Sequence, residues 1–245
     1  MYFVLKVLLL LAIILGSNAI NKFDPIINGI PTKIADFPYY AFLSGNGKSL
    51  KCGGAIIKTN VILTAAHCLS NTNFYVYTGI EDINDLWKKK PYGVKEIIKY
   101  PEYKGQTKFD VALVILSSHI QLGRTAQIIP IAPVSPKPGS TVTIVGFGKV
   151  RCDITSIDNS GRCRGGDSKV LRTANFRLTS HANRIIKTIG NNQNTCYGDS
   201  GSPVVYRNRV IGVVSSGEYI NCSGYDTQAP VAPYHKWIEK YLKEY

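Results

Sequence analysis

The chain has 245 residues, long enough to bury a full hydrophobic core as one domain or as two halves of one globule. Its 22 glycines, 12 prolines and many short runs of valine, isoleucine and tyrosine argue against a helical protein and favour an all-β fold. The net charge of +13 favours contact with polyanions or acidic surfaces, but the basic residues are scattered. A solvated basic surface therefore explains them better than a specific nucleic-acid site, and no zinc-finger or RNA-binding motif occurs.

Residues 1–19 have the features of a secretory signal peptide, because Lys6 precedes a solid apolar run and small residues follow it. The run is short for a membrane-spanning helix and no second run follows, so we expect a secreted, extracellular protein without a membrane anchor. Residues 20–25 would then form a very short pro-segment. Secretion also makes the six cysteines candidates for disulfide bonds.

Two apolar segments, 52–57 and 61–68, are separated by a polar turn and are expected to pair as strands. His67 lies near the end of the second segment, directly before Cys68. It is the candidate catalytic histidine, because a complete set of partner groups exists elsewhere in the chain. We expect ordinary structural or exposed positions for the other histidines, His119, His181 and His235.

Asp110 opens the apolar run 111–116, which we expect to be a buried strand. A carboxylate at the mouth of such a strand, next to Phe109, is costly unless it accepts hydrogen bonds. A histidine N–H is one donor that meets this need. The alternative is an ordinary capping aspartate at the start of a strand.

The segment 196–203 contains Ser200 in a Gly-Asp-Ser-Gly turn. Such a bend exposes the hydroxyl and lets the amides of Gly198 and Ser200 point at one spot, as an oxyanion hole requires. A serine hydroxyl is a poor nucleophile without a base and a group that orients the base. Taken alone, the segment could also be a plain turn between strands.

The remaining segments complete an outline of the fold. The proline-rich stretch 129–138 is expected to link two halves, and a polar, glycine-rich loop spans 148–170. The tail 234–245 has apolar residues at helical spacing on one face and predicts a helix. Further strands are expected at 142–148, 173–178 and 204–214.

In chain order, the motifs Ala-Ala-His-Cys, Asp-Val-Ala-Leu and Gly-Asp-Ser-Gly carry His67, Asp110 and Ser200. Together they strongly resemble the motifs of the trypsin/chymotrypsin-like serine peptidases, and the resemblance covers residues 26–245. It implies an all-β fold of two six-stranded antiparallel β-barrels, with the active site between them and a C-terminal helix. We expect a monomer.

The resemblance also implies the chemistry. Ser200 would attack the scissile carbonyl of a protein or peptide substrate, His67 would take and return the proton, and Asp110 would fix the histidine tautomer. The amides of Gly198 and Ser200 would hold the oxyanion, and water would hydrolyse the acyl-enzyme. No metal or organic cofactor is needed.

Ile26 begins the pattern Ile-Ile-Asn-Gly, which is close to the family's usual start. By the resemblance, cleavage before Ile26 would free an α-amine that pairs with Asp199 and orders the oxyanion loop. Pro25 departs from the family, whose zymogens mostly carry arginine or lysine at that position. The sequence therefore does not identify the activating peptidase.

The substrate-binding strand of the family matches Ser215 and Gly217. Between them, Ser216 replaces a usual tryptophan, so an apolar wall is lost. Next to the nucleophile, Ser202 replaces a usual glycine, and we expect this change to be tolerated.

By the family pattern, Asn194 lies at the base of the substrate pocket with Thr195 beside it. Relatives that cut after arginine or lysine carry aspartate at that base. Counting back from Trp237 puts Asp226 at a second floor position, where its carboxylate would favour a lysine or arginine side chain of the substrate. If Asp226 points to solvent, or the loop shifts the count, a neutral pocket with chymotrypsin-like or small-residue preference is expected.

The family pattern also implies the disulfides. Two pairs match its usual bridges, and the remaining two cysteines then pair by exclusion. Because six cysteines alone allow about 15 connectivities, this pairing is an inference from the family. The expected bridges are Cys52–Cys68, Cys196–Cys222 and Cys152–Cys163.

A second function remains open on the sequence. The chain could be a catalytically silent homologue that binds a polyanion or a protein partner through its basic surface. Silent members usually lose one of the three catalytic residues, and this chain retains all three.

Overall fold

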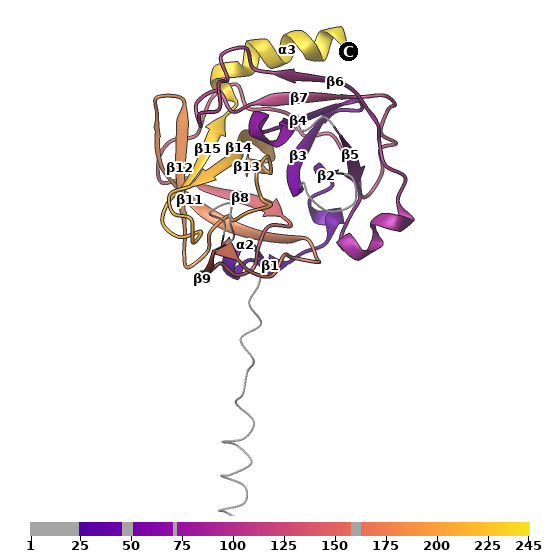
Figure 1. Cartoon of the computed structure of the whole chain (residues 1–245). Coiled ribbons are helices and arrows are strands. Elements are labelled where there is room, and N and C mark those ends of the chain that lie inside the picture. The colour runs from indigo at the N-terminus through magenta and orange to yellow at the C-terminus, as the bar shows by residue number, and fades with distance from the viewer. Residues whose placement is uncertain (1–24, 46–50, 71–72, 158–162) are drawn as a thin grey trace, which may run out of the picture.

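Figure 1 shows the computed structural model, which describes residues 25–45, 51–70, 73–157 and 163–245. In this part of the chain two antiparallel sheets lie side by side, and helix α3 (His235–Glu244) runs along one edge of the molecule. The predicted all-β fold with a C-terminal helix is confirmed. The predicted signal peptide and all but the last residue of the pro-segment lie outside the described residues. Within them, no helix has the length and hydropathy needed to cross a membrane.

The first sheet has six strands in the order β5-β2-β3-β4-β7-β6. An isolated bridge between Val76 and Tyr92 draws its two outer strands together, as in a barrel. The predicted hairpin is confirmed as β3 and β4, and the predicted buried strand is confirmed as β7. The strands are β2 (Tyr40–Gly45), β3 (Lys51–Lys58), β4 (Val61–Thr64), β5 (Phe74–Thr78), β6 (Val94–Lys99) and β7 (Ala112–Leu116).

The second sheet has the order β1-β11-β12-β15-β14-β13-β8. Because β8 also pairs with β11, six of these strands close into a barrel, and β1 (Ile30–Pro31) is an added edge strand. The predicted strand region 204–214 is in fact two strands joined by a tight turn. The other strands are β8 (Thr141–Gly146), β11 (Arg172–Ala182), β12 (Ile185–Gly190), β13 (Pro203–Tyr206), β14 (Arg209–Gly217) and β15 (Asp226–Pro230).

Two hairpin turns in the second sheet need a left-handed backbone. Asn183 and Arg184 join β11 to β12 with φ of 52° and 60°, and Arg207 and Asn208 join β13 to β14 with φ of 47° and 57°. Two consecutive residues of positive φ are the mark of the type I′ turn, whose twist matches that of the flanking strands.

The predicted polar loop 148–170 contains a small sheet of its own, formed by β9 (Asp153–Ile157) and β10 (Cys163–Arg164). The side chain of Cys163 lies outside what the structure describes, so its bridge to Cys152 stays a prediction. Short helical segments punctuate the other loops. They are α2 (Pro25–Asn28), η1 (Ile34–Asp36), η2 (Ala66–Leu69), η3 (Ile83–Lys88) and η4 (Ala232–Tyr234).

The two barrels meet at an aromatic contact. Tyr40 and Phe42 of β2 pack on Phe147, which follows β8, with ring centroids 5.8 and 5.4 Å apart. All three side chains are buried, and burying an aromatic side chain contributes about 2–3 kcal/mol. This contact fixes how the two sheets face each other.

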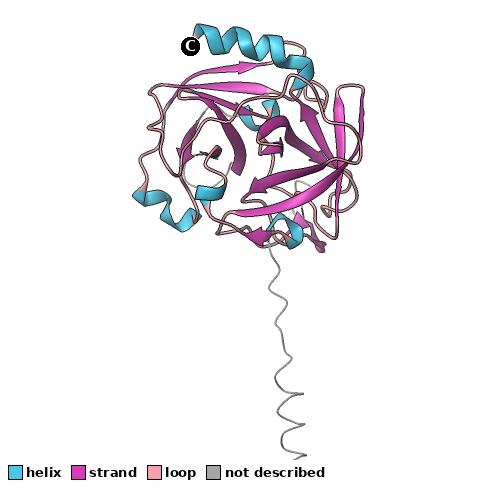
Figure 2. Ribbon diagram, turned by 180° about the vertical axis from the view of Figure 1, so that it is seen from behind, coloured by secondary structure: helices cyan, strands magenta, loops and turns pink. Residues whose placement is uncertain are grey.

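Two further connections hold the barrels together. In the predicted linker, Ile129 N donates a hydrogen bond to Ile56 O of the first sheet at 2.9 Å. Ala132 N donates to Val210 O of the second sheet at 2.8 Å. The C-terminal helix follows the last strand of the second sheet but packs on the first through the buried Ile238. Figure 2 shows α3 outside the strands, at the same edge as β6 and β7 in Figure 1.

Candidate active site

Strand pairing brings His67 and Asp110 together. In the β4–β7 ladder Thr64 lies opposite Ala112, so the residues just after β4 and just before β7 are neighbours. His67 lies in η2, which follows β4, and Asp110 precedes β7. The confirmed disulfide Cys52–Cys68 ties η2 to β3 and so fixes the segment that carries the histidine.

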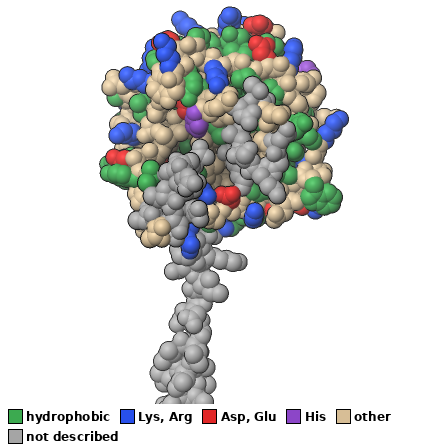
Figure 3. Space-filling view, in the orientation of Figure 1, with side chains coloured by type: hydrophobic (Ala, Val, Ile, Leu, Met, Phe, Trp, Pro, Cys, Tyr) green, Lys and Arg blue, Asp and Glu red, His purple; other side chains and the backbone are tan. Residues whose placement is uncertain are grey.

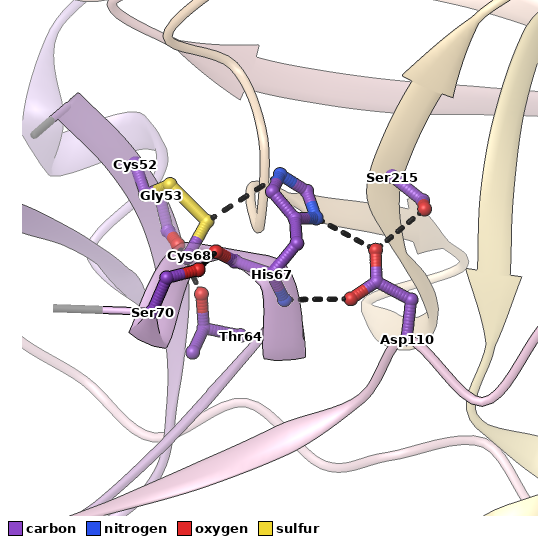
Figure 4. Close-up of a disulfide and its surroundings, with 8 residues drawn as sticks. All are labelled: Cys52, Gly53, Thr64, His67, Cys68, Ser70, Asp110 and Ser215. Atoms are coloured by element: carbon purple, nitrogen blue, oxygen red, sulfur yellow. Dashed lines mark hydrogen bonds and ion pairs between the residues drawn. A yellow bond between two sulfur atoms is a disulfide. The ribbon is translucent and has the colours of Figure 1, made fainter. Parts of the chain in front are cut away.

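The Asp110 carboxylate accepts three hydrogen bonds (Figure 4). His67 Nδ1 lies 2.7 Å from Oδ2, the His67 backbone amide donates to Oδ1 at 2.9 Å, and Ser215 Oγ donates to Oδ2 at 2.6 Å. Asp110 is only 2% exposed, so these donors replace the water that a buried carboxylate loses. The expectation that this acid binds a histidine N–H agrees with the geometry.

Phe109, next to Asp110, has a φ of 63°, which is rare for a bulky residue. Its ring stacks on Tyr100 with centroids 5.7 Å apart, and its amide donates to Tyr234 Oη at 3.2 Å. The Arg184 guanidinium lies 5.4 Å from the Phe109 ring centroid. These contacts hold a backbone conformation that costs about 1–3 kcal/mol, and they thereby aim the Asp110 carboxylate at His67.

Ser200 and His67 line one cleft, with a volume of about 360 Å³. Within the described chain no hydrogen bond joins Ser200 Oγ to the imidazole, and His67 Nε2 has a weak contact with Cys68 Sγ at 3.9 Å. Contacts of this kind are often loose before substrate binds. The imidazole is therefore oriented by Asp110, with its Nε2 edge available to the cleft.

The Ser200 loop is held from both sheets. Gly53 N of β3 donates to Ser200 O, and Gly201 N donates to Val214 O of β14, both at 2.7 Å. A Cβ on Gly201, whose φ is 76°, would come within 2.2 Å of Thr64 Oγ1. Glycine is therefore required at this position for the loop to approach β4 so closely.

The amides of Gly198 and Ser200 have no hydrogen-bond acceptor among the described residues. Gly198 has a φ of 100°, which allows the bend that turns its amide away from the usual strand direction. Both amides are therefore without an acceptor in the described part of the chain, and Ser200 itself lines the cleft.

Asp199 lies between Gly198 and Ser200 in this loop, and its side chain is completely buried. Gly148 N donates to Oδ1 at 2.8 Å and Cys196 N donates to Oδ2 at 3.0 Å. No ion pair to Asp199 occurs in the described ranges. Burial raises the pKa of this carboxyl to about 7, the two amides oppose the rise, and the nearby Asp226 adds to it.

The segment that begins at Ile26 is built into the second barrel. Ile26 is completely buried beside Ile144 of β8, and Ile27 N donates to Asn194 O at 2.9 Å. Arg172 Nη1 donates to Gly29 O at 3.0 Å. The start of this segment therefore lies on the same barrel as the Asp199 loop.

The predicted pocket residues separate into two groups. Thr195, Ser215 and Gly217 line the cleft, whereas the cleft lining includes neither Asn194 nor Asp226. Asp226 lies opposite Gly217 in the β14–β15 ladder, is 1% exposed, and accepts from Thr195 N at 3.0 Å. It therefore does not point to solvent, and burial raises its pKa to about 6. Asn194 Nδ2 donates instead to Gly224 O at 2.8 Å.

Sequence reasoning missed several residues that the structure brings to the cleft. Ser215 was expected only in the substrate-binding strand, yet its hydroxyl also holds Asp110. The other residues lie in loops whose path the sequence did not predict. They are Glu218, Tyr219 and Ile220.

Ser202, expected to be a tolerated change, is completely buried. Its hydroxyl interacts with that of the buried Tyr40, and this interaction opposes the rise in the Tyr40 pKa that burial causes. A Cβ on Gly53 would lie 2.2 Å from Ser202 Oγ, so glycine at position 53 makes room for this serine.

Two clusters of cysteine and histidine side chains are compact enough to suggest a metal-binding site. One joins Cys52 and Cys68 to His67, and the other includes Cys196 and Cys222. Both pairs are disulfides, as predicted, and a disulfide sulfur is not the thiolate that binds metal. Neither cluster is therefore a metal centre in the oxidised protein.

Comparison with known proteins places this geometry in a family. The profile of the family described as Trypsin matches residues 26–238. This chain belongs to the trypsin family of serine proteases. Rat vitamin K-dependent protein C is 31% identical over 246 residues, which cover 89% of this chain but 52% of protein C, so the chain spans about half of that relative. Trypsin epsilon of Drosophila erecta is 28% identical, with 89% of this chain and 88% of the fly protein covered.

Among solved structures, neuropsin, a serine protease expressed in the limbic system of mouse brain, superposes with a TM-score of 0.77. The match covers 88% of this trypsin-family chain and 99% of neuropsin at 22% identity. At this identity the likeness supports the fold alone.

We predict that buried Asp199 makes the chain with an intact Pro25–Ile26 bond less stable as pH rises. The pKa is about 7 in the folded chain against an ordinary value of 3.8, so the folded state holds the proton more tightly between these values. The stability contributed by the protonated carboxyl is complete at the acidic end of this window and is lost toward pH 7. Asp199→Asn should remove this loss, which is on the order of 4 kcal/mol at most.

The measurement is urea unfolding of both proteins at several pH values. Asp226 shifts in the same direction and is present in both proteins, so only the part of its contribution that comes from its repulsion with Asp199 stays in the difference. A difference in unfolding free energy that does not change with pH would contradict the prediction.

Proposed function

We propose that the protein is a secreted, monomeric serine endopeptidase that hydrolyses protein or peptide substrates through an acyl-enzyme on Ser200. The observation that carries this proposal is the contact of 2.7 Å between the buried Asp110 carboxylate and His67 Nδ1, in the cleft that Ser200 also lines. The family supports the same reaction class. The mature domain is proposed to span residues 26–245, after the signal peptide and short pro-segment.

Each group has a definite role in this mechanism. Because His67 Nδ1 donates to Asp110, Nε2 carries the lone pair that accepts the Ser200 proton as Oγ attacks the carbonyl carbon. Asp110 then stabilises the imidazolium. His67 returns the proton to the leaving amine, and a water molecule repeats the sequence to release the acid product. None of these steps requires a cofactor.

The negative charge that develops on the carbonyl oxygen needs donors that are already in position. The amides of Gly198 and Ser200 are proposed to be these donors, and their lack of acceptors within the described chain supports the assignment. Losing one such donor typically costs about 3 kcal/mol of transition-state stabilisation.

We further propose that cleavage before Ile26 activates the enzyme. The α-amine released there would pair with Asp199, a fully buried carboxylate with no cation beside it in the described ranges. A buried carboxylate without a partner is unfavourable, so pairing would stabilise the loop that carries Gly198 and Ser200. The bond of Ile27 to Asn194 supports a position for this segment close to the pocket.

A preference for lysine or arginine before the cut bond is proposed as well, through Asp226. Its place opposite Gly217, and its hydrogen bond to the amide of the cleft residue Thr195, support a carboxylate at the pocket floor. Asn194 gives no charge of its own, which leaves Asp226 as the acid in the predicted pocket.

We predict that Ser200→Ala lowers peptidase activity by about four orders of magnitude or more, because the catalytic groups act as a unit. Turnover of a peptide library and labelling by a fluorophosphonate probe measure this, with His67→Ala expected to cost about as much. Ser202→Ala is the matched control, since it removes a nearby serine hydroxyl and should still label. Absence of labelling in processed wild type would favour the silent, partner-binding alternative.

We predict that the active, secreted form begins at Ile26. N-terminal sequencing of active material tests this, because the amine can pair with Asp199 only after the Pro25–Ile26 bond is cut. The matched control carries an uncleavable segment before Ile26 and should not label with the probe. Full activity of a form that begins at Ile20 would rule out the insertion mechanism.

The charge of +13 leads to a further proposal, that the protein adheres to polyanions. Figure 3 shows lysine and arginine side chains spread over the visible face rather than gathered in one patch, which supports general adhesion over a specific site. We predict retention on heparin beyond physiological salt, with release as salt rises further. Replacing the run Lys88–Lys90 by glutamine should lower the eluting salt only slightly. Elution of wild type below physiological salt would contradict the prediction.

A further inference from the structure

The cleft contains an acidic residue that neither the proposed mechanism nor the predicted pocket uses. Glu218 directly follows Gly217, the last residue of β14, and lines the same cleft as Ser200 and His67. We propose that Glu218 selects a lysine or arginine side chain in the substrate segment that precedes the cut bond. This inference rests on the proposed peptidase function and adds a specificity residue to it.

The Glu218 carboxylate is held in place before any substrate arrives. Its backbone amide donates to Tyr225 O at 3.0 Å, and Tyr225 N donates to its Oε2, also at 3.0 Å. A Cβ on Gly224, whose φ is 82°, would come within 2.6 Å of that oxygen. A carboxylate fixed at both ends of its residue loses little conformational entropy when it binds a cation, so it discriminates better than a mobile one.

The same carboxylate has unused capacity. Only Oε2 accepts a hydrogen bond within the described chain, and no lysine, arginine or histidine there forms an ion pair with Glu218. Its side chain is exposed to the cleft. Oε1 is therefore free to accept a charge-assisted hydrogen bond from an ammonium or guanidinium group of the substrate.

The surroundings of Glu218 suit a long side chain with a charged end. Tyr219 and Ile220 line the cleft and are 57% and 54% exposed. Lysine and arginine side chains bury their aliphatic stems on apolar surface while the charged head reaches a polar partner. Tyr219 and Ile220 thus supply an apolar wall in a cleft where Ser216 leaves none.

Asp226 is less accessible to the substrate than Glu218. Asp226 is 1% exposed and accepts a hydrogen bond from the amide of Thr195, which does line the cleft. Asp226 therefore lies behind Thr195 as seen from the cleft. A substrate cation entering the cleft meets the Glu218 carboxylate at the surface. Glu218 and Asp226 therefore make separable contributions to any preference for basic residues.

The experiment compares peptides that differ only in arginine against glutamine at each position before the cut bond. The ratio of kcat/KM values for each pair is measured on wild type, Glu218→Gln, Glu218→Lys and Asp226→Asn. Glu239→Gln, at a half-exposed position of α3 outside the cleft lining, is the matched control for loss of one negative charge. Melting curves and fluorophosphonate labelling show that each variant is folded and competent.

We expect the arginine preference at one position to fall about fivefold in Glu218→Gln and to stay unchanged in Glu239→Gln, as for a partly exposed ion pair. In Glu218→Lys the same position should come to favour glutamine over arginine. In wild type the preference should weaken as salt is raised, which a purely structural role of Glu218 would not produce.

Hydrolysis with the same arginine preference in wild type, Glu218→Gln and Glu218→Lys would overturn the inference and leave the proposed function intact. Loss of the preference in Asp226→Asn alone would also overturn it. If wild type cleaves no peptide and is not labelled at Ser200, the proposed function fails and the specificity role fails with it.

Discussion

The structure depends most on one buried carboxylate that both barrels share. Asp110 accepts hydrogen bonds from His67 Nδ1 and the His67 backbone amide in the first barrel and from Ser215 Oγ in the second. A carboxylate removed from water must be satisfied by fixed donors, so the two sheets can meet only in the arrangement that supplies all three. The aromatic contact of Tyr40 and Phe42 with Phe147 stabilises that arrangement without polar groups. The site is thus a consequence of how the barrels pack.

Two more buried carboxylates lie in the second barrel. Asp199 accepts two backbone amides and Asp226 accepts the amide of Thr195, and burial raises the pKa of each carboxyl. Free energy is therefore stored in the intact chain at neutral pH, beside the loop that carries Ser200. In the proposed activation, the α-amine of Ile26 would pair with Asp199 and remove this unfavourable free energy. The charge beside Asp199 would thus control the conformation of the loop that carries Gly198 and Ser200.

Much of the fold was predictable from the sequence because local patterns of apolar and polar residues indicate the strands and the helix. The apolar run after Asp110 is β7, the segments around residues 58–60 are β3 and β4, and the tail is α3. The resemblance to the family also predicted two of the disulfides, which the structure confirms. The small sheet β9–β10 was not expected, since its short, polar strands lack the hydrophobic alternation that reveals a strand.

By itself, the sequence determined the family and the three residues proposed for catalysis, because each of these residues lies in a short motif and the three motifs follow one another in a characteristic order. Only the tertiary structure decided which acids reach the cleft. Asp226 and Glu218 are both acidic residues near Cys222, yet the β14–β15 register buries Asp226 opposite Gly217, while the end of β14 leaves Glu218 exposed. Burial depends on strand register and on loop path beyond the strand end, and neither is encoded in a local pattern of residues.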